Sequence, residues 1–578
     1  MSDVAAAIEN AASTDAPRTP NAIVRGLLAL LHTVNLPARL HDRLLLSRAK
    51  HPSLRGHPRM ARRLAGWIRY YAYDDEAWFR ADGATDDVER QRRDGFARLA
   101  ERIRLKKGRT IAASRDLSST ISDVAFTAAY RVPFQFREKV LEQLEPGCLL
   151  DASDGVRVRD LDGNWSYDVG GSYGVNLFGN DFYKRCIARG GELVQELGPV
   201  LGSYHPVITD VVRRLLALAQ KDEVSFHMSG TEAVMQAVRL ARYHTGRSHV
   251  ARFCGAYHGW WDGVQAGAGN PRPAREVYTL ADMSETTLRV LRTRRDIACV
   301  LVNPVQAMHP NGNAPTDSML VDGTRSVRYD RAAYTAWLRT LRDVCTERGI
   351  VLIFDEVFLG FRLAPGGAQE YFGVQADLVT WGKTLGGGLP IGVLCGRADL
   401  MRRFRDDAPA DICFARGTFN SHPYVLGAMH EFLVHLDRPE VRASYVGLDA
   451  LWDGRKNHLN ERLERAAVPV RVTNFTSVWS VLFTVPGRYH WMLQFYLRDA
   501  GVAMSWIGTG RFVFSHAWTD ADFEGFADAF VAAAEAMRAD GWWWTAPGTT
   551  VKSIRRRVLR ETLRAALRRA SGRSTRPS

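Results

Sequence analysis

The chain has 578 residues, of which 46% are hydrophobic and 24% are charged, a composition typical of globular proteins. No apolar run approaches the about 20 residues that a transmembrane helix needs, and residues 1–20 lack the basic start and apolar stretch of a signal peptide. Seven scattered cysteines without a Cys-x-x-Cys pair argue against a disulfide framework and a structural zinc site, so we expect a cytoplasmic protein without bound metal.

The N-terminal fifth of the chain differs from the rest. Residues 1–20, rich in Ala, Ser and Thr, are expected to be disordered. Residues 21–125 carry many arginines and place apolar residues at helical spacing, which predicts a helical extension. The extension matches no module that we can name. A lid over the site, a dimer extension and a dock for a carrier protein are alternative roles.

Residues 126–545 alternate apolar, strand-like runs with amphipathic helices. This alternation predicts an α/β fold around a buried, mostly parallel sheet. The clearest strand candidates are 224–228, 250–253, 298–302 and 351–354. Because ligands of such sheets bind beyond the C-terminal strand ends, the residues that follow these runs are candidates for a site.

Three small residues follow the run 224–228: Ser229, Gly230 and Thr231. A helical stretch, 233–243, comes next. Small residues at a strand-to-helix turn leave backbone N–H groups at the helix N-terminus, where a phosphate can bind. An ordinary N-cap with Glu232 in the first turn is the alternative.

Two further candidates also follow strand-like runs. Tyr257 lies among glycines after the run 250–253, where its ring can lie flat on a ligand ring or pack onto the core. Asp355 closes the apolar run 350–354, and a buried carboxylate needs a partner. A protonated pyridine nitrogen or a nearby arginine, with Arg362 as the candidate, would provide that partner.

Lys383 stands between Gly382 and the three glycines at 386–388, which predicts a lysine on a tight loop. A lysine that forms a Schiff base and an aspartate that pairs with a ring nitrogen are the two groups that pyridoxal phosphate (PLP) needs. A surface lysine is the alternative. Further along, Thr418 offers a hydroxyl to a phosphate, and Arg416 adds a positive charge for a substrate anion.

The order and spacing of these motifs resemble class III aminotransferases of the fold-type I PLP enzymes, a group that includes glutamate-1-semialdehyde aminomutase. The resemblance covers about residues 140–540 and is carried by SGTEAVMQAVRLARYHTGR (229–247), GAYHGWWDG (255–263), LIFDEVFLGFR (352–362) and GGAQEYFGVQADLVTWGKTLGGGLPIGVL (366–394). Within the group the chain is most similar to the aminotransferase domains of hybrid polyketide–peptide synthetases, through residues 174–179, 304–306, 365–369 and 417–423.

The resemblance implies a central, mostly parallel sheet, a smaller C-terminal α+β domain and a homodimer. We expect an N-terminal arm of the catalytic body at 126–200, a PLP-binding large domain at 201–430, a small domain at 431–545 and a basic helix or tail at 546–578.

The resemblance also implies roles for single residues. Lys383 would form the Schiff base, and Asp355 would pair with the pyridinium nitrogen. The other cofactor contacts would be the phosphate-binding Ser229, Gly230, Thr231 and, from the second subunit, Thr418, with Tyr257, His258 and Gln306 around the ring. Asn303 replaces a glutamate and Arg416 a small residue of the family pattern, so both make the substrate pocket more positive.

The expected reaction is transfer of an amino group from an amino-acid donor to a ketone or aldehyde acceptor. The closer resemblance suggests a β-ketoacyl group on an acyl carrier protein in natural-product biosynthesis. A 1,2-aminomutase and a PLP enzyme that forms carbon–carbon bonds use the same residues and are alternatives. A non-catalytic scaffold is not expected, because both Lys383 and Asp355 are present.

The C-terminal tail carries most of the net charge of +14. Residues 551–578 contain ten Lys or Arg against one acid, Glu561, and an apolar stripe at helical spacing, which predicts a basic amphipathic helix. Such a helix can pack on the protein itself, lie on an anionic membrane surface or dock an acidic carrier protein. Nucleic acid is not expected, because no recognised module accompanies the charge.

Overall fold

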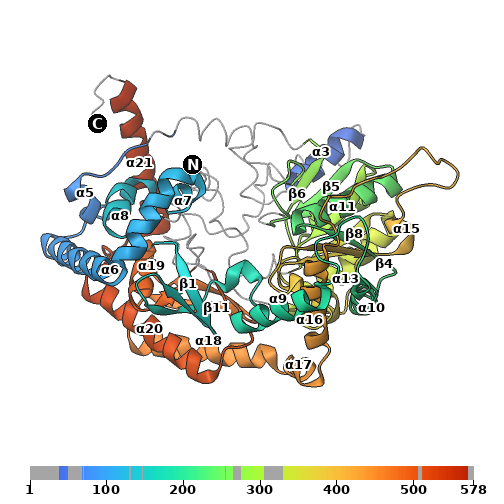
Figure 1. Cartoon of the computed structure of the whole chain (residues 1–578). Helices are drawn as coiled ribbons and strands as arrows, with labels where there is room; N and C mark the ends of the chain where they lie inside the picture. Colours follow the sequence, from blue (N-terminus) through green and yellow to red (C-terminus); the bar gives the residue numbers. More distant parts are fainter. Residues whose placement is uncertain are drawn as a thin grey trace.

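The computed structural model describes residues 38–49, 68, 70–128, 132–145, 147–253, 256–264, 275–304, 330–504 and 511–570. Residues 1–20, expected to be disordered, and most of 21–67 lie outside this set. The chain forms two lobes joined along α9 and α16 to α18 (Figure 1). One lobe contains the largest sheet, and the other combines the N-terminal helices with the C-terminal part of the chain.

The largest sheet has seven strands in the order β4-β10-β9-β8-β7-β5-β6. All its pairings are parallel except those of β10, which runs antiparallel to β4 and β9. The expected strands are confirmed as β4, β5, β7 and β8. The strands are β4 (Glu223–His227), β5 (His249–Phe253), β6 (Val277–Leu280), β7 (Ile297–Val302), β8 (Val351–Asp355), β9 (Leu378–Gly382) and β10 (Gly392–Gly396).

Helices cover both faces of this sheet. Successive side chains of a strand point to opposite faces, so Leu301 and Ile353 pack on α11, whereas Val300 and Leu352 join the core on the other face. The strands are therefore apolar along their whole length. The helices of this lobe are α3 (Ala38–Ala49), α10 (Val207–Ala219), α11 (Gly230–Thr245), α12 (Glu285–Thr293), α13 (Arg331–Arg348), α14 (Gly367–Phe372), α15 (Ala398–Met401) and α16 (Pro423–Leu436).

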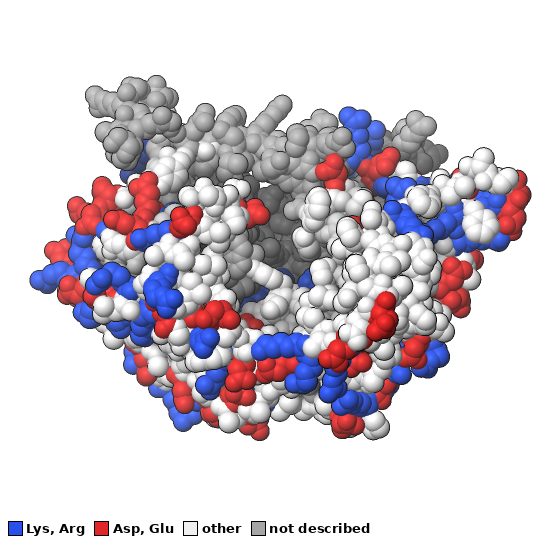
Figure 2. All heavy atoms as spheres, in the orientation of Figure 1, with Lys and Arg blue, Asp and Glu red and all other residues white. Residues whose placement is uncertain are grey.

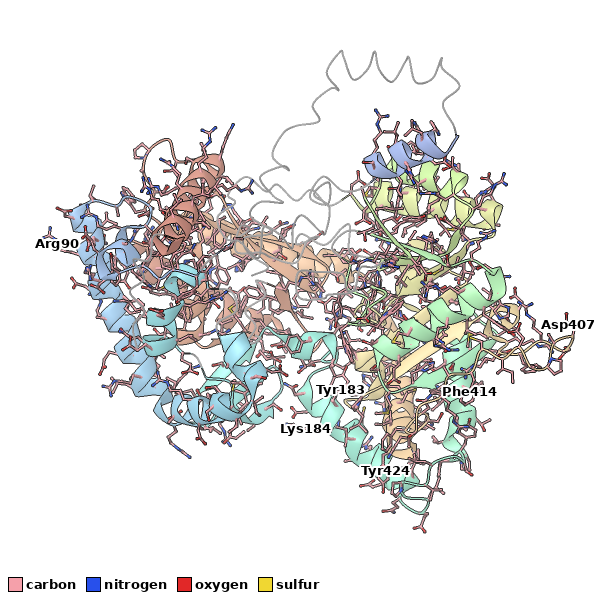
Figure 3. All side chains as sticks on the ribbon, turned by 90° about the horizontal axis from the view of Figure 1, so that it is seen from above. Arg90, Tyr183, Lys184, Asp407, Phe414 and Tyr424 are labelled. Carbon is pink, nitrogen blue, oxygen red and sulfur yellow. The ribbon has the colours of Figure 1, made fainter. Side chains whose placement is uncertain are left out.

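Helix α9 (Asn180–Val194) packs closely on α16. A Cβ atom at Gly190 would lie 2.3 Å from the backbone nitrogen of Ala428, so only glycine permits this approach. Figure 3 shows Tyr183 and Tyr424 on these two helices, and Asp407 at the far end of a segment that projects from the sheet lobe. The close packing of α9 and α16 ties the N-terminal arm to the sheet lobe.

The second lobe holds two small sheets, β1-β2-β3-β13 and β11-β12-β14. The expected C-terminal α+β unit is present here. The strands of this lobe are β1 (Leu150–Asp154), β2 (Arg157–Asp160) and β3 (Trp165–Asp168) from the N-terminal arm, and β11 (Val470–Phe475), β12 (Val478–Phe483), β13 (Val502–Ala503) and β14 (Arg511–Val513) from the C-terminal unit. Its helices are α17 (Pro439–Ala443), α18 (Leu448–Arg465), α19 (Leu493–Asp499) and α20 (Asp520–Ala539).

The N-terminal extension shares one hydrophobic core with this lobe. Trp78 is 1% exposed, and its ring centroid lies 6.0 Å from those of both Trp491 and Trp542. The main-chain N–H of Ala81 donates a hydrogen bond to the Tyr489 hydroxyl at 2.9 Å. The part of the extension in this lobe forms α5 (Asp75–Arg80) and α6 (Asp86–Thr120), whereas α3 packs in the sheet lobe. Helix α7 (Ser122–Ala128) crosses the predicted end of the extension, and α8 (Arg137–Gln143) belongs to the N-terminal arm.

The predicted basic C-terminal helix is α21 (Val551–Ala570), and it packs on the extension. Val551 and Ile554 are buried, and Glu561 accepts hydrogen bonds from the hydroxyls of Tyr71 and Tyr73. Its inner face therefore docks on the protein itself. Elsewhere on the visible face, acidic and basic side chains alternate (Figure 2). Among the described residues, no helix is long and apolar enough to span a bilayer.

Candidate active site

Strand β8 delivers Asp355 to the C-terminal edge of the large sheet. Its carboxylate is 2% exposed because the strand before it is entirely buried. Oδ2 lies 2.7 Å from Nδ1 of His258, while Oδ1 accepts hydrogen bonds from the main-chain N–H of Val357 at 3.2 Å and from the Thr380 hydroxyl at 3.3 Å. These contacts hold the carboxylate in one orientation.

Arg362, the arginine considered as a partner of Asp355, binds elsewhere. Its guanidinium donates to the Ser477 hydroxyl at 2.9 Å and to the carbonyl oxygens of Phe514 at 2.6 Å and Asn176 at 3.2 Å. It connects the two lobes, and burial lowers its pKa to about 10. Among the described residues the charged partner of Asp355 is thus a histidine, which is cationic only when protonated.

His258 is itself buried, with 1% of its surface exposed. Its Nδ1 atom is engaged with Asp355, while Nε2 has no hydrogen-bond partner within the described part of the chain. The neighbouring Tyr257 is 61% exposed. Burial and the Asp355 charge together raise the pKa of the Tyr257 phenol. The short segment after β5 thus carries one residue that fixes the carboxylate and one aromatic ring beside it.

Lys383 follows β9 directly and opens a single 3-10 turn, Lys383–Gly386. Its φ of 48° lies in the left-handed region that non-glycine residues seldom adopt, a strain that accumulates at functional sites. Burial lowers the pKa of the amine, and the Asp355 charge partly opposes this effect. Nζ lies 5.9 Å from the centroid of the Phe358 ring.

The N-terminus of α11 forms another wall. Ser229 is the N-cap, and its side chain accepts from the main-chain N–H of Glu232 at 3.3 Å. Glu232 in turn accepts from the N–H of Met228 at 2.9 Å, so the ordinary capping interpretation holds. The positive end of the helix nevertheless points into a cavity. A Cβ atom at Gly230 would lie 2.5 Å from Cγ1 of Val357.

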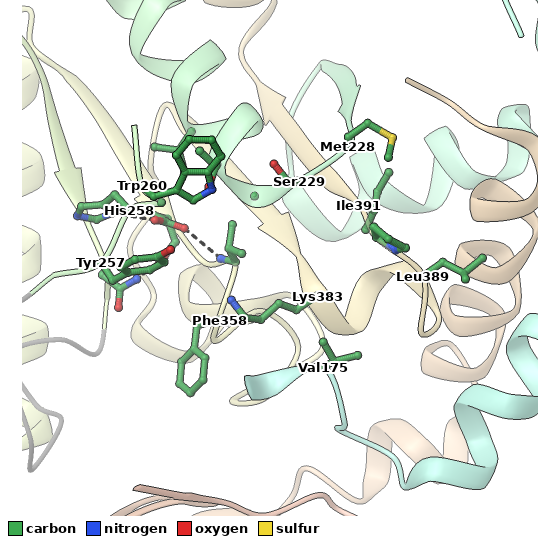
Figure 4. Close-up of a pocket in the computed structure, with 18 of the residues that line it drawn as sticks. Val175, Met228, Ser229, Tyr257, His258, Trp260, Phe358, Lys383, Leu389 and Ile391 are labelled. Carbon is green, nitrogen blue, oxygen red and sulfur yellow. Dashed lines mark hydrogen bonds and ion pairs between the residues drawn. The ribbon is translucent and has the colours of Figure 1, made fainter. Parts of the chain in front are cut away.

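One cavity of about 450 Å³ brings these groups together. Lys383 extends toward the side that holds Tyr257, His258 and Phe358 (Figure 4). Sequence reasoning missed Phe358 and Trp260, although both lie within motifs carrying the family resemblance. The predicted residues that line the cavity are Ser229, Gly230, Thr231, Tyr257, His258, Asn303, Asp355 and Lys383.

The other predicted residues are placed differently. Asn303 lines the cavity, and its side-chain amide donates to the main-chain oxygen of Asp355 at 3.2 Å. Arg416 and Thr418 belong to an exposed segment and do not line the cavity. Gln306 lies outside the described residues. An amine, a fixed carboxylate and a helix N-terminus therefore surround a space that suits a ligand with a carbonyl, a cationic ring nitrogen and an anionic group.

Comparison with known proteins identifies the family of this chain. The sequence model of the family "Aminotransferase class-III" matches residues 141–533. A glutamate-1-semialdehyde 2,1-aminomutase of Nitratidesulfovibrio vulgaris (strain DP4) is 33% identical over 318 residues, which cover 51% of this chain and 72% of the relative. The glutamate-1-semialdehyde 2,1-aminomutase of Alkaliphilus oremlandii (strain OhILAs) is 30% identical over 417 residues, which cover 68% of this chain and 92% of the relative.

Solved structures share the fold. A transaminase with PLP bound is 26% identical, with a TM-score of 0.58 over 72% of this chain and 94% of its own. A glutamate-1-semialdehyde aminomutase from Pseudomonas aeruginosa PAO1 is 20% identical, with a TM-score of 0.61 over 77% of this chain and 99% of its own. The chain therefore belongs to the class III aminotransferases, fold-type I enzymes that use pyridoxal phosphate.

Proposed function

We propose that this protein transfers an amino group from an amino-acid donor to a ketone or aldehyde, with Lys383 as the lysine that binds PLP. The observation that carries the proposal is the cavity in which the Lys383 amine, the fixed Asp355 carboxylate and the N-terminus of α11 meet. Bound PLP supplies an electron sink for the carbanion that forms at the donor's α-carbon.

The environment of Lys383 suits a group that must act both as nucleophile and as base. Both roles require the neutral amine, and burial lowers its pKa, so a larger fraction is neutral near pH 7 than for an exposed lysine. Lys383 would bind the cofactor between turnovers. Once released by the donor, it would move the proton from the donor's α-carbon.

Asp355 would hold the proton on the ring nitrogen of PLP. A buried carboxylate is costly without a partner, and a pyridinium cation would supply one on the side that faces the cavity. His258 would act as a positioning residue, because it contacts the carboxylate at 2.7 Å. Tyr257 would lie on the ring, and Asn303, which lines the same cavity, would contact the substrate.

The phosphate would bind at Ser229, Gly230 and Thr231, where the helix N-terminus favours an anion. Gly230 supports this assignment because a side chain there would collide with Val357. We further propose a homodimer in which Thr418 of one subunit reaches the phosphate of the other. The exposure of residues 416–419 supports this arrangement, and Gln306 would complete the ring contacts.

The acceptor that we propose is a β-ketoacyl group on a carrier protein. Its support is the similarity of residues 174–179, 304–306, 365–369 and 417–423 to aminotransferase domains of hybrid synthetases. Relative to the family pattern, Asn303 removes a negative charge from the cavity and Arg416 adds a positive charge on an exposed segment outside it. Both changes favour an acidic carrier protein. The second candidate is a 1,2-aminomutase, because the two curated relatives described above are both named glutamate-1-semialdehyde 2,1-aminomutase.

Product analysis separates the two candidates. The PLP-loaded protein is incubated with single amino acids, and the keto acid released from each is quantified together with bleaching of the visible cofactor band. A transferase releases one keto acid per cofactor without any acceptor. An aminomutase given its own substrate returns a rearranged product and accumulates no keto acid. Absence of keto acid from every donor would reject the transfer proposal.

A further inference from the structure

Helices α5 and α21 lie in the lobe that does not contain the large sheet (Figure 1). Residues of α5 and α21, together with Tyr73 and Ala81, line a second polar cavity. Its volume is about 360 Å³, and a neighbouring cavity of about 100 Å³ shares Arg557 and Arg560 with it. Every residue that lines the larger cavity belongs to 73–81 or 557–564. Both segments lie outside residues 141–533, so the cavity is an addition to the family fold.

Three arginines line the larger cavity from α21: Arg557, Arg560 and Arg564. Their spacing of three and four residues places them on one face of the helix. Arg80 lines the same cavity from α5. Part of the tail's positive charge is therefore gathered around one open cavity, where Arg557, Arg560 and Arg564 remain exposed to solvent.

The carboxylates at these cavities already have cationic partners. Glu561 lies 3.2 Å from Nη1 of Arg488. In the smaller cavity, Asp82 accepts two hydrogen bonds from Arg92, at 2.7 and 2.9 Å. Arg80 lies 2.9 Å from Asp86. None of these acids is left to neutralise the α21 arginines.

Two of the arginines that line the larger cavity donate to main-chain oxygens within the described part of the chain. Arg557 donates to the carbonyl oxygen of Ala81 at 3.0 Å, and Arg560 donates to that of Arg556 at 3.4 Å. Among the residues that the structure describes, no Asp or Glu forms an ion pair with Arg557, Arg560 or Arg564. Like charges gathered around one cavity repel each other, and a bound anion would remove that repulsion.

We propose that the cavity between α5 and α21 binds a ligand that carries phosphate groups. A planar guanidinium donates two parallel hydrogen bonds to phosphate oxygens, and several arginines on one helix face suit an anion with more than one negative charge. The phosphate has two chemical sources: a soluble diphosphate, or a phospholipid head group. The exposed Leu559, Leu563 and Leu567 on the same helix would then contact the acyl chains of the lipid.

The test compares two double variants of the PLP-loaded, full-length protein. Arg560→Gln with Arg564→Gln removes two charges from the cavity. Lys552→Gln with Arg556→Gln removes two exposed charges from the same helix and leaves the cavity intact. Calorimetry measures inorganic pyrophosphate binding. Co-sedimentation measures binding to vesicles of phosphatidylglycerol and phosphatidylcholine, with pure phosphatidylcholine as reference. Thermal unfolding and the visible PLP band verify that each variant is folded.

Loss of two charge-assisted contacts should weaken binding by about tenfold or more in the cavity variant and by less than about threefold in the control. Pyrophosphate binding with this pattern identifies a soluble ligand. Vesicle binding with this pattern, without pyrophosphate binding, identifies a lipid head group. Binding that both variants lose equally reflects general basic charge and overturns the proposal, as does the absence of binding to either probe.

Discussion

Nδ1 of His258 lies 2.7 Å from Oδ2 of Asp355, and both side chains are almost completely buried. The two residues come from different segments, one after β5 and one at the end of β8. Their contact joins two strand-end loops at the point where the proposed cofactor ring would bind. Because Asp355 is the hydrogen-bond partner of His258 within the described part of the chain, the influence of His258 on the reaction would pass through Asp355.

Replacing Asp355 by Asn should lower kcat by about 100-fold or more, because a neutral amide cannot stabilise a protonated ring nitrogen. The amide has nearly the same shape, and Lys383 is untouched, so the visible cofactor band should remain. Stopped-flow kinetics and absorbance measure the two effects. Asp151→Asn, at an exposed site on β1, serves as the matched control and should leave kcat unchanged. Near-normal turnover of the Asp355 variant would reject this role.

Replacing Lys383 by Ala should abolish the band that borohydride reduces and lower kcat by about 1,000-fold or more, because the base that moves the proton is removed. Lys221 provides the control, since it hydrogen bonds to Gln375 away from the cavity. Lys221→Ala should retain both the band and the rate. A Lys383→Ala protein that keeps a reducible band would show that another amine binds the cofactor.

Replacing Gly230 by Ala should weaken PLP binding by about tenfold, because the new Cβ would lie 2.5 Å from Val357 and displace the helix N-terminus from the phosphate. Titration of the apoprotein with PLP measures the dissociation constant. Gly454→Ala is the matched control, since a Cβ atom there meets nothing within 4 Å. Equal PLP affinity of the two variants would contradict the phosphate assignment.

Glu356 gives a prediction about pH. Burial raises its pKa to about 8, whereas the pKa of an exposed glutamate is about 4.3. Between these values the folded protein binds more protons than the unfolded protein, so Glu356 makes the free energy of unfolding fall as pH rises. Glu356→Gln stays neutral and should be more stable than the wild type at pH 9, by about 1 to 3 kcal/mol.

The stabilisation by Glu356→Gln should shrink at pH 5, where the wild-type carboxyl is protonated in the folded protein. Denaturant unfolding at both pH values measures the difference. Gln can keep the acceptor that binds the N–H of Ala368, so local structure is preserved. A constant difference at the two pH values would mean that Glu356 does not titrate in this range.

Subunit mixing tests the homodimer proposal. Thr418→Ala should weaken PLP binding by about tenfold, and Lys383→Ala should be inactive. A mixed dimer holds one site with an intact Lys383 and an intact Thr418 from the other subunit. Activity at limiting PLP should therefore rise above the average of the two variants after subunit exchange. If Thr418 instead contacts the phosphate in its own subunit, the activity of the mixture equals the average of the two variants.

The sequence contained enough information to predict the strand-end positions of Asp355, Ser229 and Tyr257, because buried parallel strands are continuous apolar runs that end where ligands bind. Strands β9 and β10 were not predicted. Both are as completely buried as β8, but they flank the glycine-rich segment, whose turn signals obscured the strand pattern. The antiparallel direction of β10 depends on pairing across the sheet, which local sequence does not encode.

Long-range contacts account for the other differences. Arg362 was considered a partner of Asp355 because seven positions separate them, yet its acceptors include Phe514, from a distant segment. The histidine that does contact Asp355 lies 97 positions away. Periodicity could indicate that residues 21–125 are helical, but not that Trp78 packs between Trp491 and Trp542.

That shared aromatic core has a consequence for how the protein reaches its native state. Residues near position 80 complete their packing only with side chains beyond position 490, so these contacts close a loop of most of the chain. Closing such loops is slow, so Trp78 and Phe79 can pack early on Phe96 and reach their distant partners only late in folding. The core of the second lobe is therefore complete only once the segment that carries Trp542 has been synthesised.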